Sequence, residues 1–260
     1  MGVVSHETLK VRFQDSICFV QIDRPQANNT INQRLIAELT EVIETCERDS
    51  SVVVLSGLPE VFCFGADFNE THNGARHGTE PSHGPEALYE LWLKLATGPF
   101  ISIAHVRGKT NAGGIGFVAA SDLVLADDTA TFSLSELLFG VIPACVLPFL
   151  IRRAGFQKAH YLTLTTQPVP VQQAHAWGIV DAWEPRSESL LHKHLLRLRR
   201  LSKTAITRYK RYMAELDGSL ERLKQPAIAV NRTVFSDPKN LEGIVRYVEK
   251  GLFPWEAERI

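Results

Sequence analysis

Two adjacent glycines, Gly113 and Gly114, precede the apolar run 115–120 in the stretch NAGGIGFVAASD. A backbone N–H can bind a developing negative charge only where no side chain covers it, and glycine has no side chain. The apolar run is typical of a buried helix, and a helix N-terminus carries partial positive charge. The glycine pair therefore indicates an anion or oxyanion site. Close packing of the backbone would also require glycine here, and this alternative stays open.

A second small-residue turn, Gly65-Ala66, lies in the stretch VFCFGADFNE and also follows an apolar strand-like run. Two such turns on neighbouring strands of one parallel sheet would direct two N–H groups at one carbonyl oxygen. That arrangement stabilises an enolate or a tetrahedral oxyanion. Neither stretch has the glycine spacing of a dinucleotide-binding or P-loop motif, so a nucleotide phosphate is less favoured.

Strand and helix signals alternate through the first half of the chain, which predicts an α/β fold with a parallel sheet. From residue 148 onward the pattern is mostly helical, and residues 71–85 read as a loop, a candidate lid over an active site. The expected strands are 9–14, 17–25, 51–57, 100–108, 122–128 and 130–136, and the expected helices are 31–46, 86–96 and 114–120.

Net charge, the length of the apolar stretches and the cysteine spacing limit the classes of protein to which the chain can belong. The formal net charge of the 260 residues is −1, so no basic surplus indicates nucleic acid. No apolar stretch reaches the roughly 20 residues that a membrane span needs. The cysteines have no metal-ligand spacing, which favours reduced thiols in a cytoplasmic protein without a metal. They are Cys18, Cys46, Cys63 and Cys145.

Three stretches, FCFGAD, NAGGIGFVAASD and FSLSELLFGVIP, resemble in order and spacing the crotonase (enoyl-CoA hydratase/isomerase) superfamily. The resemblance covers nearly the whole chain. It implies a ββα-repeat spiral core over 1–195 and a helical C-terminal trimerisation region over 196–260, assembled as a homotrimer or a dimer of trimers. It also implies an acyl-thioester site with Ala66 and Gly113 as the two oxyanion N–H donors, flanked by Gly65 and Gly114.

Hydratases of this superfamily use two glutamates, and this sequence matches only one of them. Gly116 stands at the position of the first, whereas Glu136 matches the second. The resemblance therefore implies a single carboxylate that removes a C2 proton and returns it to a leaving C3 hydroxyl. On residues alone, a surface glutamate near a turn is the favoured interpretation of Glu136.

The stretches GKTNAGG and SDPKN are similar to one branch, the dehydratases of polyketide β-branching. This similarity implies loss of water from 3-hydroxy-3-methylglutaryl-acyl carrier protein to give 3-methylglutaconyl-acyl carrier protein. The substrate would be carried on phosphopantetheine, and no further cofactor is implied. The alternatives are an isomerase or hydratase acting on a CoA thioester, and a non-catalytic subunit that binds the acyl carrier protein.

Other polar residues near the motifs have alternative roles. Asp67 reads as a helix cap or as a second acid/base. Asn111 and Lys109 are candidate partners of the substrate's hydroxyl or distal carboxylate. Cys145 reads as an apolar wall. The histidines of the 71–85 loop fit no metal template, and they are His72, His77 and His83.

Residues 192–212 contain many cations and no acidic residue. This stretch reads either as a solvated helix face or as a docking surface for an acidic carrier protein or a phosphate.

Overall fold

The structure is a computed structural model, and it describes residues 6–70 and 84–257. Its larger sheet has the strand order β1-β2-β3-β5-β7-β10, parallel from β2 onward, with β1 antiparallel at the edge. The strands of this sheet are β1 (Leu9–Gln14), β2 (Ile17–Ile22), β3 (Val52–Ser56), β5 (Ile101–Val106), β7 (Leu123–Ala126) and β10 (Ala182–Trp183).

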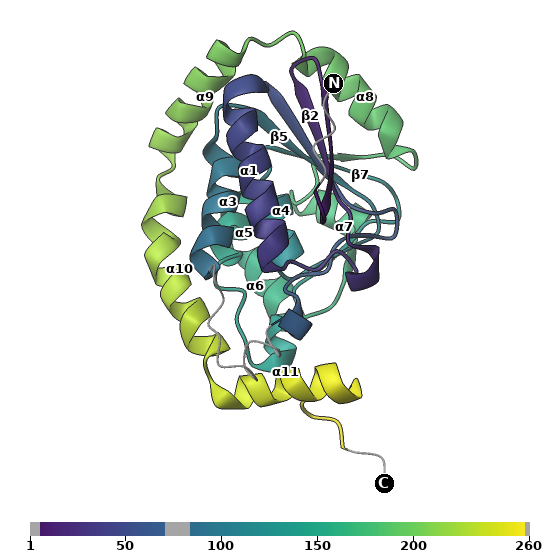
Figure 1. Ribbon diagram of the computed structural model, residues 1–260, viewed down its shortest axis with the longest axis vertical. Helices are drawn as coiled ribbons and strands as arrows, with labels where there is room; N and C mark the ends of the chain where they lie inside the picture. Colours follow the sequence, from purple (N-terminus) through teal and green to yellow (C-terminus); the bar gives the residue numbers. More distant parts are fainter. Residues whose placement is uncertain (1–5, 71–83, 258–260) are drawn as a thin grey trace.

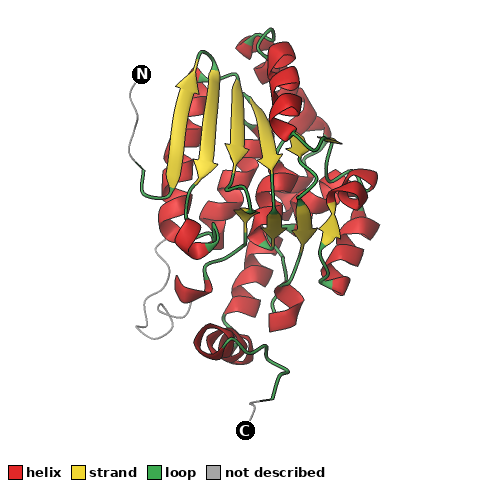
Figure 2. Ribbon diagram, turned by 90° about the vertical axis from the view of Figure 1, so that its right-hand side faces the viewer, coloured by secondary structure: helices red, strands yellow, loops and turns green. Residues whose placement is uncertain are grey.

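A second, smaller sheet with the order β4-β6-β8-β9 lies beyond the ends of the larger one (Figure 2). β4, β6 and β8 are parallel, and β9 pairs antiparallel with β8. Its strands have only two or three residues each, so their sequences carry no alternation signal. They are β4 (Val61–Cys63), β6 (Lys109–Asn111), β8 (Thr131–Ser133) and β9 (Val169–Pro170).

The chain repeatedly passes from a strand of the larger sheet to a strand of the smaller sheet and then to a helix. The passes are β3-β4-α3, β5-β6-α4 and β7-β8 followed by the 3-10 helix η2 and α5. The expected ββα-repeat core is therefore confirmed. Because β4, β6 and β8 run parallel, the turns after these strands meet at one edge of the smaller sheet.

Apolar residues cover both faces of the larger sheet, as the strand 51–57 predicts. In β3, Val53 and Leu55 belong to the main core, whereas Val52 and Val54 face a second cluster under α8 (Ser187–Leu198). The other face is covered by the helices α1 (Gln33–Asp49), α3 (Pro85–Thr97) and α4 (Gly113–Ala120).

Local signals place the helix termini. α1 begins after Asn32, whose Oδ1 accepts a hydrogen bond of 2.9 Å from the N–H of Leu35. The prediction of 31–46 therefore started two residues early. α3 begins at Pro85, because proline suits the first helical position and has no N–H to satisfy. The 3-10 helices are η1 (Pro25–Ala27) and η2 (Glu136–Phe139).

The C-terminal helices wrap around the core along one side and across one end (Figure 1). α9 (Lys203–Leu216) packs on α3, α10 (Ser219–Phe235) packs on α3 and α5, and α11 (Pro238–Lys250) packs on η2. The helical last third is thus confirmed, apart from the two-residue strands β9 and β10. The remaining helices are α5 (Leu147–Ala154), α6 (Phe156–Thr165) and α7 (Val171–Ala176). None of the described helices is long and apolar enough to cross a membrane.

Candidate active site

The two predicted oxyanion turns come together after β4 and β6, which are neighbours in the smaller sheet. Gly65 has φ +92°, and a Cβ there would lie 2.6 Å from the Cβ of Ala112 and 3.4 Å from the nitrogen of Gly113. Ile31 holds this turn, because its N–H donates to the Gly65 carbonyl at 2.7 Å and its carbonyl accepts from Asp67 at 2.9 Å. Glycine at 65 is therefore required by conformation and by space.

The N–H groups of Ala66 and Gly113 are both available at these turns. Neither takes part in the turn and loop backbone hydrogen bonds of the part of the chain that the structure describes. Ala66 is exposed. Two unpartnered N–H groups on adjoining turns fit a carbonyl oxygen that becomes negatively charged.

Backbone strain is concentrated beside this pair. Ala112 has φ 51° and ψ −122°, a conformation that costs a residue with a Cβ about 1–3 kcal/mol. Its N–H donates to the Ser133 carbonyl at 3.0 Å, and its carbonyl accepts from Ile115 at 2.9 Å. The ψ of Ala112 sets the orientation of the 112–113 peptide plane, so the strain determines where the Gly113 N–H points.

Glu136 begins η2, three residues after β8 ends. Its Oε2 is out of contact with solvent and has no hydrogen-bond partner among the described residues. Burial raises the pKa of Glu136 to about 7, although backbone N–H groups of Glu136 and Ser135 bond the carboxylate and act in the opposite direction. A carboxyl with this pKa exchanges protons readily near neutral pH, as a general base must.

Asn111 connects the oxyanion strand to the segment that carries Glu136. Its Nδ2 donates to Ser135 Oγ at 2.8 Å, and its Oδ1 accepts from Ser133 Oγ at 2.8 Å. Only 7% of Asn111 is exposed. In this structure the amide therefore holds two serines of the Glu136 segment, and its predicted contact with substrate remains a prediction.

The structure places Asp67 and Lys109 differently from the glycines. Asp67 is buried, with Oδ2 2.9 Å from Nη2 of Arg24 and Oδ1 accepting from the Asn69 N–H at 3.1 Å. The bond from the Asn69 N–H is that of a helix cap, and the contact with Arg24 is an ion pair. Lys109 is exposed at the start of β6, whereas the glycines follow its end. Sequence reasoning missed Arg24, which no local pattern connects to Asp67.

Gly114 and Gly116 make room for protein atoms. A Cβ at Gly114 would lie 2.4 Å from the Cys63 carbonyl, so this glycine lets α4 approach β4. A Cβ at Gly116 would lie 2.3 Å from Cζ2 of Trp92. The indole of Trp92 thus occupies the space that any side chain at 116 would need, including a glutamate. Sequence reasoning also missed this residue, because α3 is distant in sequence.

Cys145 and Phe139 belong to apolar clusters of the described residues. Burial raises the pKa of the Cys145 thiol to about 12, so this residue is an uncharged part of the core. Phe139 of η2 packs against Tyr247 of α11, with ring centroids 5.2 Å apart. Asn240 Nδ2 of α11 donates to the Gly140 carbonyl at 3.1 Å. The C-terminal helix therefore supports the turn that carries Glu136.

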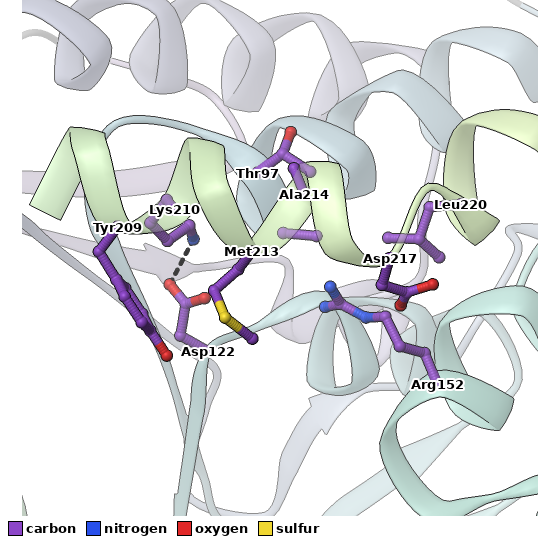
Figure 3. Close-up of a pocket in the computed structure, with 10 residues that line it drawn as sticks. Thr97, Asp122, Arg152, Tyr209, Lys210, Met213, Ala214, Asp217 and Leu220 are labelled. Carbon is purple, nitrogen blue, oxygen red and sulfur yellow. Dashed lines mark hydrogen bonds and ion pairs between the residues drawn. The ribbon is translucent and has the colours of Figure 1, made fainter.

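Two cations of the basic stretch bind groups of other elements, and of these Lys210 is buried and Lys203 is half-buried. Lys203 Nζ donates to the Ser50 carbonyl at 2.5 Å, at the end of α1. Lys210 Nζ lies 2.5 Å from Oδ2 of Asp122, beside a cavity of about 130 Å³ (Figure 3). The α8–α9 corner lies at the opposite end of the molecule from α11, which contacts η2 (Figure 1). Within one chain, the basic stretch is therefore remote from Glu136.

The predicted loop histidines, His72, His77 and His83, lie outside the described residues. Within 6–70 and 84–257, no group of three or more His, Cys, Asp or Glu side chains is placed to hold a metal ion.

Comparisons with known proteins agree with this geometry. The model of the enoyl-CoA hydratase/isomerase family matches residues 12–258. The bacillaene synthase dehydratase PksH of Bacillus subtilis (strain 168) is 57% identical over 99% of this chain and 100% of its own length. A hydroxycinnamoyl-CoA hydratase-lyase of Pseudomonas fluorescens is 31% identical over 70% of this chain and 68% of its length.

Solved structures of enoyl-CoA hydratase/isomerase relatives superimpose on this chain. A crystal structure of a polyketide biosynthesis enoyl-CoA hydratase (pksH) from Bacillus subtilis superimposes with a TM-score of 0.94 at 57% identity. It covers 96% of this chain and 100% of that one. An enoyl-CoA hydratase/isomerase structure from Acinetobacter baumannii, at 22% identity and a TM-score of 0.83 over 94% of this chain and all of that one, shows the same fold.

Proposed function

Because this chain belongs to the enoyl-CoA hydratase/isomerase family, we propose that it is a dehydratase of polyketide biosynthesis that acts on a 3-hydroxyacyl thioester. The specific substrate that we propose is 3-hydroxy-3-methylglutaryl-acyl carrier protein, and the product is the 3-methylglutaconyl thioester. The observation that carries this proposal is the carboxyl of Glu136, whose Oε2 is shielded from solvent and whose pKa is raised to about 7, in the segment that follows β8, the strand next to β6 and its oxyanion turn.

The reaction follows from this arrangement. The Glu136 carboxylate removes the C2 proton, and the electron pair moves onto the thioester oxygen. The N–H groups of Ala66 and Gly113 bind the resulting enolate oxygen. When the enolate collapses, the C3–O bond breaks, a C2–C3 double bond forms, and the hydroxyl leaves as water with the proton that Glu136 returns.

A single carboxyl suffices because its two tasks follow one another. Glu136 is a base in the first step and an acid in the second, and a pKa near 7 suits both. Trp92 against Gly116 leaves no space for a second carboxylate on α4. Asp67 is held by Arg24, and we propose that its role is structural.

We further propose that the thioester is carried on the phosphopantetheine of an acyl carrier protein, with CoA as the alternative carrier. The proposed reaction requires neither a metal nor a redox cofactor, since only protons are transferred. A cytoplasmic homotrimer or dimer of trimers is the expected assembly, and nucleic acid is not an expected partner. The relative PksH, described as a dehydratase of bacillaene synthase, supports the carrier-bound substrate.

Intact-protein mass spectrometry of 3-hydroxy-3-methylglutaryl-acyl carrier protein tests this function. Incubation with the enzyme should remove one water mass from the carrier-bound chain, whereas the Glu136→Gln variant should leave the mass unchanged. An unchanged mass with folded wild-type protein would contradict the dehydratase function.

A second candidate is an enoyl-CoA isomerase, and the closed position at Gly116 favours it, because moving a double bond can also be done with one carboxylate. Its product has the same mass as its substrate. A panel of unsaturated CoA thioesters, followed by chromatography of the products, distinguishes the two reactions.

A further inference from the structure

The indole nitrogen of Trp92 is a polar atom that has no hydrogen-bond partner in the described part of the chain. Trp92 lies on α3 and is 1% exposed, and its Nε1 has no hydrogen bond among the described residues. Buried donors are nearly always satisfied, because leaving one unpaired costs its desolvation. A partner that arrives with a ligand would remove this cost.

The indole is placed beside the oxyanion turn. A Cβ on Gly116 would lie 2.3 Å from Cζ2 and 2.4 Å from Cε2 of the ring, so the ring packs directly on the backbone of α4. The same Cζ2 lies 4.0 Å from the position of a Cβ on Gly113, whose N–H is one of the two oxyanion donors. Trp92 is therefore adjacent to the residue that would bind the thioester oxygen.

Two aromatic neighbours hold the ring in this position. Phe117 and Phe149 pack against Trp92 near edge-to-face, with centroid distances of 5.9 and 5.8 Å. Such packing leaves the indole little freedom to rotate toward another acceptor. The N–H is thus held in a fixed orientation before any ligand binds. A fixed orientation is expected of a binding group and is not required of a donor that is unpaired by chance.

Exposure sets the direction in which a bound chain would run. Ala66 is exposed at the rim, whereas Oε2 of Glu136 and the indole of Trp92 are shielded from solvent. An acyl chain that runs inward from a thioester carbonyl held at the turns would pass the ring of Trp92, whose Cζ2 adjoins Gly113. The group on that chain that needs a donor is an oxygen close to the carbonyl.

We propose that the Nε1–H of Trp92 donates a hydrogen bond to the C3 hydroxyl of the bound acyl chain, an assignment that rests on the proposed dehydratase function. Glu136 performs both proton transfers, and the indole keeps its proton throughout. The hydrogen bond orients the hydroxyl toward Glu136 and stabilises the negative charge that develops on the oxygen as the C3–O bond breaks.

Indole NMR tests this contact directly, in a Glu136→Gln background so that nothing is turned over. The chain has four tryptophans, so a ¹⁵N spectrum contains four indole signals, and Trp92→Phe identifies one of them. Two probes are compared, 3-hydroxybutyryl-pantetheine and butyryl-pantetheine. The Trp92 indole proton should shift downfield with the hydroxylated probe and much less with the saturated one.

Equal shifts with both probes, or no shift while other site amides respond to the hydroxylated probe, would overturn the proposal. Kinetics give an independent result. Trp92→Phe should lower kcat for 3-hydroxybutyryl-pantetheine about tenfold, the value of one hydrogen bond, while KM changes little. Trp177→Phe, just after the end of α7, where the ring contacts Tyr161 and Lys158, is the matched control and should change neither constant. An unchanged kcat in Trp92→Phe, with unchanged melting temperature, would also overturn the proposal.

Failure of the proposed function is distinguishable from failure of this assignment. If the wild-type enzyme removes no water from any 3-hydroxyacyl thioester, the function fails, whereas the NMR comparison still reports whether the indole contacts a C3 oxygen. If the wild-type enzyme removes water and the Trp92 indole signal shifts equally with the hydroxylated and the saturated probe, only the assignment of Trp92 fails.

Discussion

Replacing Glu136 with glutamine should stabilise the protein relative to the wild type, by an amount that grows as the pH rises. The same replacement should remove the activity. Burial raises the pKa of Glu136 to about 7 from its usual value of 4.5. Between these two values, the folded protein retains a proton that the unfolded chain has released. The free energy of unfolding of the wild type therefore falls with rising pH across this window, and the stabilising contribution is complete only below about 4.5.

The magnitude follows from the two pKa values. Each pH unit between them lowers the free energy of unfolding of the wild type by about 1.4 kcal/mol. From pH 5 to pH 8 the loss sums to about 2.5 kcal/mol, since the slope ends near pH 7. Glutamine does not titrate, so Glu136→Gln escapes this loss. For a domain of this size the difference corresponds to roughly 5–10 °C in Tm.

The assay is thermal unfolding of both proteins at pH 5 and at pH 8. The quantity of interest is the difference in Tm between variant and wild type, because every other titrating group is shared and cancels. This difference should be larger at pH 8 than at pH 5 by roughly 5–10 °C. A Tm difference that is the same at pH 5 and at pH 8 would refute the conclusion that the Glu136 carboxyl is buried and retains its proton in the folded protein.

Kinetics of the same pair complete the test. The wild-type kcat/KM should rise tenfold per pH unit below about 7 and level off above it, because the base must be ionised. Glu136→Gln should lower kcat by about 100- to 10,000-fold. A stable variant with full activity would assign the base to another residue.

Three further changes test the supporting contacts. Asp67→Asn should lower Tm while kcat is retained, because it weakens the buried ion pair with Arg24. A lower kcat at unchanged Tm would instead indicate that Asp67 takes part in proton transfer. Gly116→Ala should destabilise the fold by about 1–3 kcal/mol, since its Cβ meets the Trp92 ring, and denaturant titration that shows no loss would contradict this packing. Lys210→Ala should lower the free energy of unfolding by about 1–3 kcal/mol, because Asp122 loses its ion pair and keeps only its hydrogen bonds from Ser102, and the same titration measures the loss.

Much of the larger sheet and its covering helices could be predicted from sequence. β3 is recognisable because a run of valines buried on both faces has a strong local signature, and α1 because its apolar residues recur at helical spacing. β4 and β6 were not predictable as strands, since three residues carry no period. Their pairing comes from long-range hydrogen bonds.

For the site, the sequence by itself determined which groups are present. The glycines at 65 and 113 mark turns whose backbone must be uncovered, and the order of the motifs identifies Glu136 as the retained carboxyl. These are local properties, because a missing side chain and a positive φ belong to one residue and its neighbours. Resemblance to the superfamily extended them to a reaction.

Only the tertiary structure decided what each polar side chain does. Burial, and with it the raised pKa of Glu136, arises from segments distant in sequence. The same holds for Arg24, which pairs with Asp67 across 43 positions, and for Trp92, which fills the space beside Gly116. A pKa, an ion pair and a steric exclusion depend on which atoms meet in space, and one sequence read along its length does not contain that information.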